Sequence, residues 1–99
     1  MADQFDIWRT ATGDLVLVLQ HDLLSDLATR TVCVVLPESS PAPTIAALAP
    51  VISAGDLRLR IVPHVLATLT LSELGQKVTY VAHHRDRIIR AFDVMLSGT

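Results

Sequence analysis

Short apolar runs near the start of the chain predict a β-hairpin and buried strands. Residues 5–9 are mostly apolar, residues 15–19 are entirely Leu and Val, and Gly13 and Asp14 lie in the turn-like segment between them. The run at 15–19 and a second one at 31–36 lack polar alternation, which is typical of strands covered on both faces. We therefore expect these two strands inside a sheet.

A further strand is predicted after Gly55. Residues 56–61 alternate, which places Leu57, Leu59 and Ile61 on one face. Pro63 cannot donate to a ladder and is expected to end this strand. Residues 65–71 fit either a strand or a short helix, and residues 77–81 fit another strand.

Proline marks the least regular part of the chain. Four of the five prolines lie between residues 37 and 55. This spacing predicts the longest irregular segment, interrupted by a short apolar turn at residues 45–48.

The clearest helix is predicted at the end of the sequence. Apolar residues recur there at the i, i+3, i+4, i+7 spacing that forms one stripe: Ile88, Ile89, Ala91, Phe92, Met95 and Leu96. The stripe is expected to fasten the helix to the sheet, with Ile88, Phe92 and Met95 in the core. Gly98 occupies the position of a C-terminal cap.

Composition indicates one domain with apolar surface to spare. The chain has 99 residues, of which 51% are hydrophobic and 18% charged. A domain of this size buries only about two-thirds of its unfolded surface, so we expect a single domain over residues 1–99 that forms an oligomer.

Charge and cysteine content indicate the kind of partner and the cellular compartment. A formal net charge of −2 gives no reason to bind nucleic acid or anionic lipid. The single cysteine, Cys33, needs no oxidising compartment. The first residues do not resemble a signal peptide, and no apolar run reaches the roughly 18 residues of a membrane span. These features predict a cytoplasmic protein.

No catalytic motif is present in the sequence. His83 and His84 are adjacent, so on a helix they point about 100° apart rather than at one metal ion. Cys33 lies between valines and is interpreted as an inert core residue. A basic group on the final helix is interpreted as a solvated face: Arg85, Arg87 and Arg90. We predict neither a metal nor a cofactor.

Several stretches taken together resemble the CcdB family, the toxin half of bacterial type II toxin–antitoxin modules. They begin with residues 4–9 (QFDIWR) and Gln20, Asp22, Leu23, Leu24, Asp26, Leu27, Thr29 and Arg30. They continue with Pro50–Ile52 and Gly55, Leu66–Ala67, Leu74–Gly75, and Arg85, Ile88, Ala91–Asp93, Leu96 and Gly98. Each stretch is short, and their order and spacing carry the resemblance across the whole chain.

The resemblance implies a mainly β fold, an antiparallel SH3-like barrel closed by one C-terminal α-helix, and a homodimer. It also implies a protein that catalyses nothing. Members of the family poison DNA gyrase by binding its A subunit, and a CcdA antitoxin neutralises them.

The residues that match the family's gyrase contact lie in two segments. They are Leu23 and Leu24 after the second strand, and Asp93, Leu96, Ser97, Gly98 and Thr99 at the chain end. Ser97 stands where the best-known member has tryptophan. Because serine is a small anchor, one alternative is a relative that is not toxic and only dimerises and binds antitoxin.

A second alternative is an endoribonuclease like the MazF-type toxins, which share the barrel-like architecture. Such an enzyme needs a basic groove, for which Arg30, Arg58 and Arg60 are the candidates.

Overall fold

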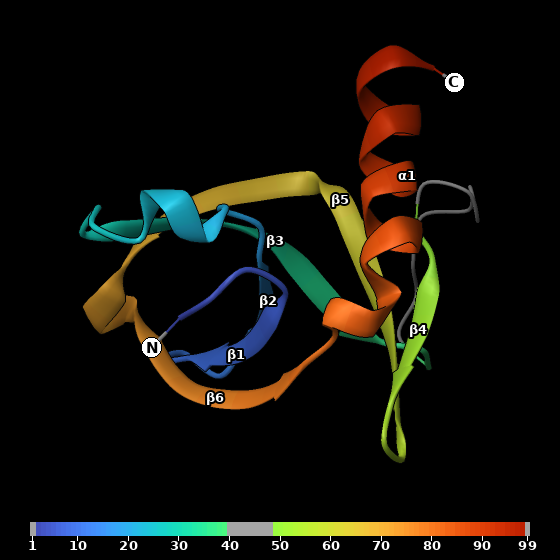
Figure 1. The fold of residues 1–99 in the computed structure, drawn as a ribbon. Coiled ribbons are helices and arrows are strands. Elements are labelled where there is room, and N and C mark those ends of the chain that lie inside the picture. Colours follow the sequence, from blue (N-terminus) through green and yellow to red (C-terminus); the bar gives the residue numbers. More distant parts are fainter. Residues whose placement is uncertain (1, 40–48, 99) are drawn as a thin grey trace.

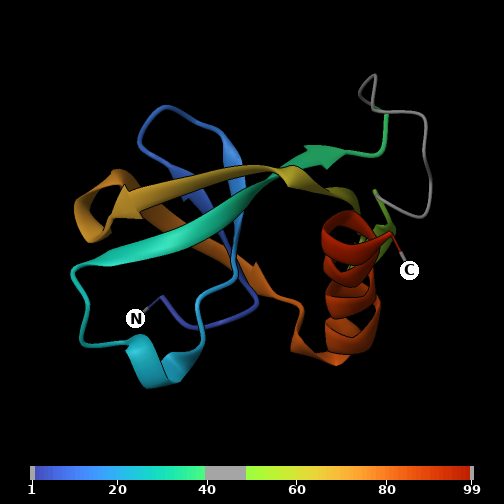
Figure 2. The same ribbon diagram turned by 90° about the horizontal axis from the view of Figure 1, so that it is seen from above.

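The computed structural model describes residues 2–39 and 49–98, in which six strands precede one α-helix (Figures 1 and 2). The strands are β1 (Asp6–Thr10), β2 (Leu15–Val18), β3 (Thr29–Pro37), β4 (Val51–Ala54), β5 (Leu57–Thr70) and β6 (Leu74–Tyr80). The helical elements are α1 (Arg85–Ser97) and three 3₁₀ turns, η1 (Asp22–Leu24), η2 (Leu71–Glu73) and η3 (Ala82–His84). This confirms a mainly β fold with one C-terminal helix.

All six strands form one antiparallel sheet in the order β4-β5-β3-β2-β1-β6. The sheet curls into a half-barrel, with β6 on the side opposite β3 and β5 in Figure 1. Gly75 lies within β6, where an added Cβ would come within 2.8 Å of the Arg9 carbonyl oxygen. A glycine there permits β6 to approach β1 closely.

The central strands are covered on both faces, as their unbroken apolar runs predict. Leu17 on β2 and Cys33 on β3 belong to a core cluster that includes Ile88 of α1. Val16 and Val32 point to the other face and join a second cluster inside the half-barrel. Because successive side chains alternate between faces, each run contributes to both clusters.

The prediction that Pro63 ends a strand is wrong. β5 continues to Thr70 and pairs with β3 along most of its length. The ladder shifts register at Pro63: Val34 pairs with Val62, whereas its neighbour Cys33 pairs with Leu66. Residues 63–65 form an irregularity in which proline need not donate a ladder hydrogen bond. β5 bends between its two halves in Figure 1, and residues 65–70 are a strand rather than a helix.

The proline-rich stretch contains a strand that sequence reasoning missed. β4 pairs with the start of β5 through a tight turn at Gly55, whose φ is +62°. On β5, Leu59 and Ile61 are buried as predicted, whereas Leu57 remains exposed. The apolar turn expected at residues 45–48 lies outside the described residues.

The terminal helix confirms the predicted stripe in part. Ile88 and Ala91 are buried, whereas Phe92 and Met95 are only half-buried. Gly98 adopts a left-handed conformation with φ +76° and caps the helix, as expected. The apolar contact therefore weakens toward the end of the chain.

Candidate functional site

The last turn of α1 is the first candidate surface. Leu96 is 77% exposed, and Asp93 and Ser97 are also exposed. In Figure 1 the end of α1 extends past the strands. An exposed leucine at a helix end is apolar surface that a partner could cover.

Local contacts hold this end of the helix. The Ser97 hydroxyl donates to the Asp93 carbonyl oxygen at 2.7 Å, and the Gly98 N–H donates to the Val94 carbonyl oxygen at 2.9 Å. Both bonds span four residues within the helix end. Thr99, the last predicted contact residue, lies outside the described residues.

The 3₁₀ turn η1 is the second candidate surface. Leu23 is 86% exposed and Leu24 is 51% exposed. The His21 Nδ1 atom accepts a hydrogen bond from the Leu23 N–H and caps the turn. Two adjacent leucines are thus displayed on a short ordered turn.

Polar contacts from distant parts of the chain hold η1. The Gln20 side chain donates to the Leu24 carbonyl oxygen at 2.9 Å. The Asp22 carboxylate accepts from the Gln4 N–H at 2.8 Å. The Arg30 guanidinium donates to backbone carbonyls of the segment that follows η1. These bonds fix the turn without burying its leucines.

The structure does not bring the two predicted surfaces together within one protomer. In Figures 1 and 2, η1 and the end of α1 lie at opposite sides of the molecule. The two surfaces therefore form one continuous contact only if a second copy of the chain, or an extended partner, connects them.

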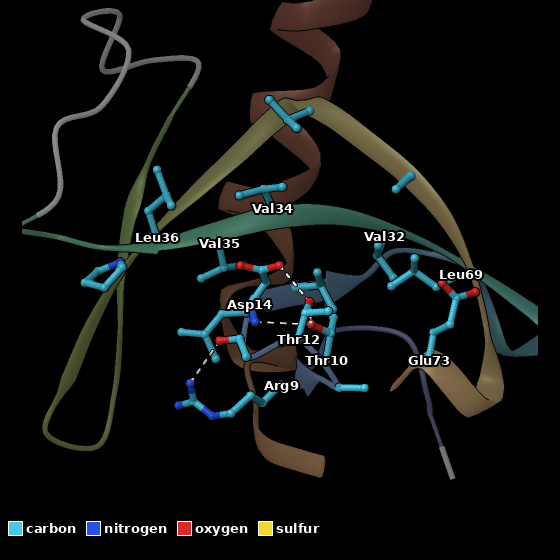
Figure 3. Close-up of a pocket in the computed structure, with 17 residues that line it drawn as sticks. Arg9, Thr10, Thr12, Asp14, Val32, Val34, Val35, Leu36, Leu69 and Glu73 are labelled. Atoms are coloured by element: carbon cyan, nitrogen blue, oxygen red, sulfur yellow. Dashed lines mark hydrogen bonds between the residues drawn. The ribbon is translucent and has the colours of Figure 1, made fainter. Parts of the chain in front are cut away.

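A groove that sequence reasoning missed lies between the β1–β2 turn and the sheet (Figure 3). Its volume is about 590 Å³. β3 and β5 supply an apolar side: Val32, Val34, Leu36, Val65, Ala67 and Leu69. The sequence feature that could have indicated this groove is the uncharged stretch at residues 65–70. It fits a partly exposed strand if the preceding strand continues past Pro63.

The opposite side of the groove is polar and internally bonded. The Thr10 hydroxyl lies 3.0 Å from that of Thr12, which donates to the Asp14 carboxylate at 3.0 Å. Arg9 donates to the Gly13 carbonyl oxygen at 3.3 Å. At the far end, the Thr70 N–H and hydroxyl donate to Glu73 and hold the pKa of that carboxyl below its ordinary value of 4.5.

The three arginines considered for a nuclease do not form one basic groove. Arg30 is buried and bonded to backbone carbonyls, and Arg58 pairs with Glu38 at 2.7 Å. In the ladder between β3 and β5, Arg60 lies opposite Leu36 of β3. Arg30 is six residues before Leu36 on the same strand. At about 3.3 Å per residue this is roughly 20 Å. None of the three lines the groove.

Cys33 and the histidine pair were the other candidate reactive groups. Burial raises the pKa of the Cys33 thiol to about 12, so the thiolate is disfavoured at neutral pH. The rings of His83 and His84 lie 4.2 Å apart, and no group of three potential metal ligands exists within residues 2–39 and 49–98. No helix in the same residues has the length and apolar character to cross a membrane.

Several solved structures share this fold at low sequence identity. An endoribonuclease from Mycobacterial species is 15% identical with a TM-score of 0.79, covering 95% of this chain and 89% of that chain. A second, in complex with its cognate antitoxin, is 15% identical with a TM-score of 0.81, covering 97% and 95%. Mycobacterium tuberculosis toxin MazF-mt6 is 14% identical with a TM-score of 0.70, covering 91% and 93%.

Sequence comparison gives the family. None of the proteins of curated function matches this chain in sequence. The family model described as CcdB protein matches residues 4–98. That range contains all six strands and α1, so the match extends over the complete fold. The chain belongs to the CcdB family.

Proposed function

We propose that this chain is the toxin of a type II toxin–antitoxin module and that it inhibits DNA gyrase by binding the A subunit. The observation that carries the proposal is the display of Leu23 and Leu96 at 86% and 77% exposure on two ordered turns. Both leucines lie in the two segments that the resemblance to the CcdB family assigns to the gyrase contact. The protein would act by surface complementarity and catalyse no reaction.

The proposal includes a homodimer, and the separation of the two surfaces supports it. Each protomer carries one η1 turn and one α1 end at opposite sides. A two-fold pair of protomers would present a symmetric surface to the dimeric A subunit. Further exposed apolar residues support association, namely Leu57, Val65, Leu66 and Leu71.

The same proposal includes an antitoxin similar to CcdA and a cytoplasmic site of action. One fold neighbour was solved in complex with its cognate antitoxin, which supports a partner of this kind. A net charge of −2 supports action on protein rather than on nucleic acid.

Growth inhibition tests the proposal directly. The full chain is expressed in a sensitive host, and in a matched host whose gyrase A subunit resists toxins of this family. Expression should arrest growth in the first host only. Deletion of residues 97–99 should abolish the arrest without unfolding the protein, because Ser97 and Gly98 are exposed and follow the buried part of α1. Equal arrest of both hosts, or arrest by the truncated chain, would contradict gyrase as the target.

An endoribonuclease is the second candidate function. Its support is the fold shared with the two endoribonucleases and the groove beside the β1–β2 turn. Incubation of the purified chain with RNA distinguishes the two candidates. The proposed toxin leaves RNA intact, whereas sequence-specific fragments that disappear with a groove variant such as Asp14→Ala would establish the nuclease.

A third candidate is the relative that dimerises and binds antitoxin without toxicity. Ser97, in place of a large aromatic residue, is the feature that favours it. This candidate predicts normal growth of both hosts and no binding to the A subunit.

A further inference from the structure

Arg30 is a buried cation without a carboxylate partner. Its side chain is 1% exposed, and its guanidinium forms no ion pair with any described residue. Isolated charges are costly to bury unless hydrogen bonds replace the lost water. The hydrogen bonds of a buried, unpaired guanidinium can therefore hold the backbone around it in one conformation.

Four backbone carbonyl oxygens replace the water. Nε donates to Ala2 at 3.0 Å, and Nη1 donates to Leu27 at 2.7 Å and Thr29 at 2.9 Å. Nη2 donates to Ser25 at 3.1 Å. Two of these acceptors, Ser25 and Leu27, lie in the segment that joins η1 to β3, and Thr29 is the first residue of β3. The planar fork of arginine thus bonds one short loop at several points.

The loop held by Arg30 has an unusual distribution of polar and apolar groups. Its carbonyls turn toward the guanidinium in the interior, whereas Leu23, Leu24 and Leu27 are 86%, 51% and 50% exposed. In a flexible loop such leucines would tend to pack against the protein, because burial of apolar surface lowers the free energy. Arg30 and Gln20 donate to backbone carbonyls of this loop, at Ser25 and Leu24.

We infer that Arg30 is a positioning residue that holds the η1 leucines in a conformation ready to bind a partner. This inference rests on the proposed gyrase contact and adds the group that organises it. A preorganised loop binds more tightly because less conformational entropy is lost on association. Removal of the guanidinium should therefore weaken binding although Arg30 touches no partner.

Arg60 provides a matched control. It also donates from Nη1 to a backbone carbonyl, that of Ala49 at 2.9 Å, and it is half-buried. It lies toward the opposite end of β3 from Arg30. An Arg60→Met change thus removes a similar side chain without touching η1.

The experiment combines amide hydrogen exchange with binding to the purified gyrase A subunit. Arg30→Met should speed exchange at Ser25 and Leu27 by about tenfold or more and leave Leu17 and Cys33 protected. Affinity for the A subunit should fall roughly tenfold, with Arg30→Lys intermediate and Arg60→Met within about twofold of wild type. Unchanged exchange in residues 22–28, or faster exchange with unchanged affinity, would overturn the inference.

Two further variants separate this inference from the proposed function. Gln20→Ala removes the donor to the Leu24 carbonyl oxygen, and the acceptor of the Thr31 N–H, without exposing a buried cation. It should reproduce a smaller part of both effects even if Arg30→Met does not fold. Leu23→Ser tests the contact itself. Loss of affinity in Leu23→Ser without loss in Arg30→Lys and Gln20→Ala refutes only the positioning role. Unchanged affinity in Leu23→Ser refutes the η1 contact and the positioning role with it.

Discussion

The η1 turn and the end of α1 display leucines of similar exposure, but the chain supports them in different ways. η1 bonds with Gln4 and Gln20, and Ser25 directly after it accepts a bond from Arg30; all three partners lie outside the turn. At the end of α1, Ser97 and Gly98 donate hydrogen bonds to carbonyl oxygens four residues earlier. Hydrogen bonds from distant residues therefore contribute to the first surface, and hydrogen bonds within the helix contribute to the second. Changes in the core should disturb η1, and changes at the tail should leave the fold intact.

The largest expected effect on this comparison comes from Arg30. Arg30→Met removes the donor of one buried and three partly buried hydrogen bonds, so the free energy of unfolding should fall by about 4 kcal/mol. Urea denaturation measures the change. Arg58→Met, which removes an exposed pair with Glu38, should cost no more than about 0.5 kcal/mol. Similar values for both variants would show that Arg30 does not stabilise the η1 side.

Loss of the helix anchor should have the next largest effect. Ile88 is fully buried and is the residue of α1 within the main core cluster. Ile88→Ala should reduce the free energy of unfolding by about 3 kcal/mol through lost contacts and a cavity. Leu96→Ala, on the same helix, should change it by less than about 0.5 kcal/mol. A comparable loss for Leu96→Ala would place the helix end in the core rather than at a free surface.

A smaller effect is expected at the helix cap. Gly98 has φ +76°, and an added Cβ would meet no described atom within 4 Å. The cost of Gly98→Ala therefore comes from the backbone alone and should be about 1 kcal/mol, confined to the last turn. Amide exchange should quicken at the Gly98 position and remain unchanged in β2 and β3. Faster exchange throughout α1 would show that the cap supports the entire helix.

The smallest effect concerns pH at the groove. Because Thr70 lowers the pKa of Glu73 in the folded state, the bonds stabilise the protein above pH 4.5, where the unfolded carboxyl is ionised. This stabilisation is lost as pH falls through the lowered folded pKa. Thermal unfolding of the wild type and of Glu73→Gln across the acidic pH range measures the effect. The difference in stability between the two proteins should become smaller at low pH. A stability difference that becomes larger at low pH would contradict a lowered pKa of Glu73 in the folded state.

The regular parts of the fold were predictable because their signals are local. The unbroken runs at β2 and β3 indicate strands covered on both faces, and the stripe around Ile88 indicates α1. The course of β5 was not predictable, because Pro63 is tolerated only through a register shift against Cys33 and Val34. That irregularity depends on a partner strand far away in the sequence.

The candidate site was predictable only as separate residues. Leu23 and Leu96 could be named from the resemblance, but their placement at opposite sides of the protomer depends on the curl of the sheet. The role of Arg30 could not be found from sequence, because its acceptors are backbone carbonyls that leave no pattern in residue types.

Titration of the purified chain into the purified gyrase A subunit tests the central claim most directly. We predict saturable binding by the wild-type protein, and loss of binding when Leu23→Ser and Leu96→Ser are combined in a variant that keeps its circular dichroism spectrum. Each single variant should retain part of the affinity, because the two surfaces lie apart. Absence of binding by the folded wild-type chain at about 100 µM, or equal affinity of the double variant, would contradict the account.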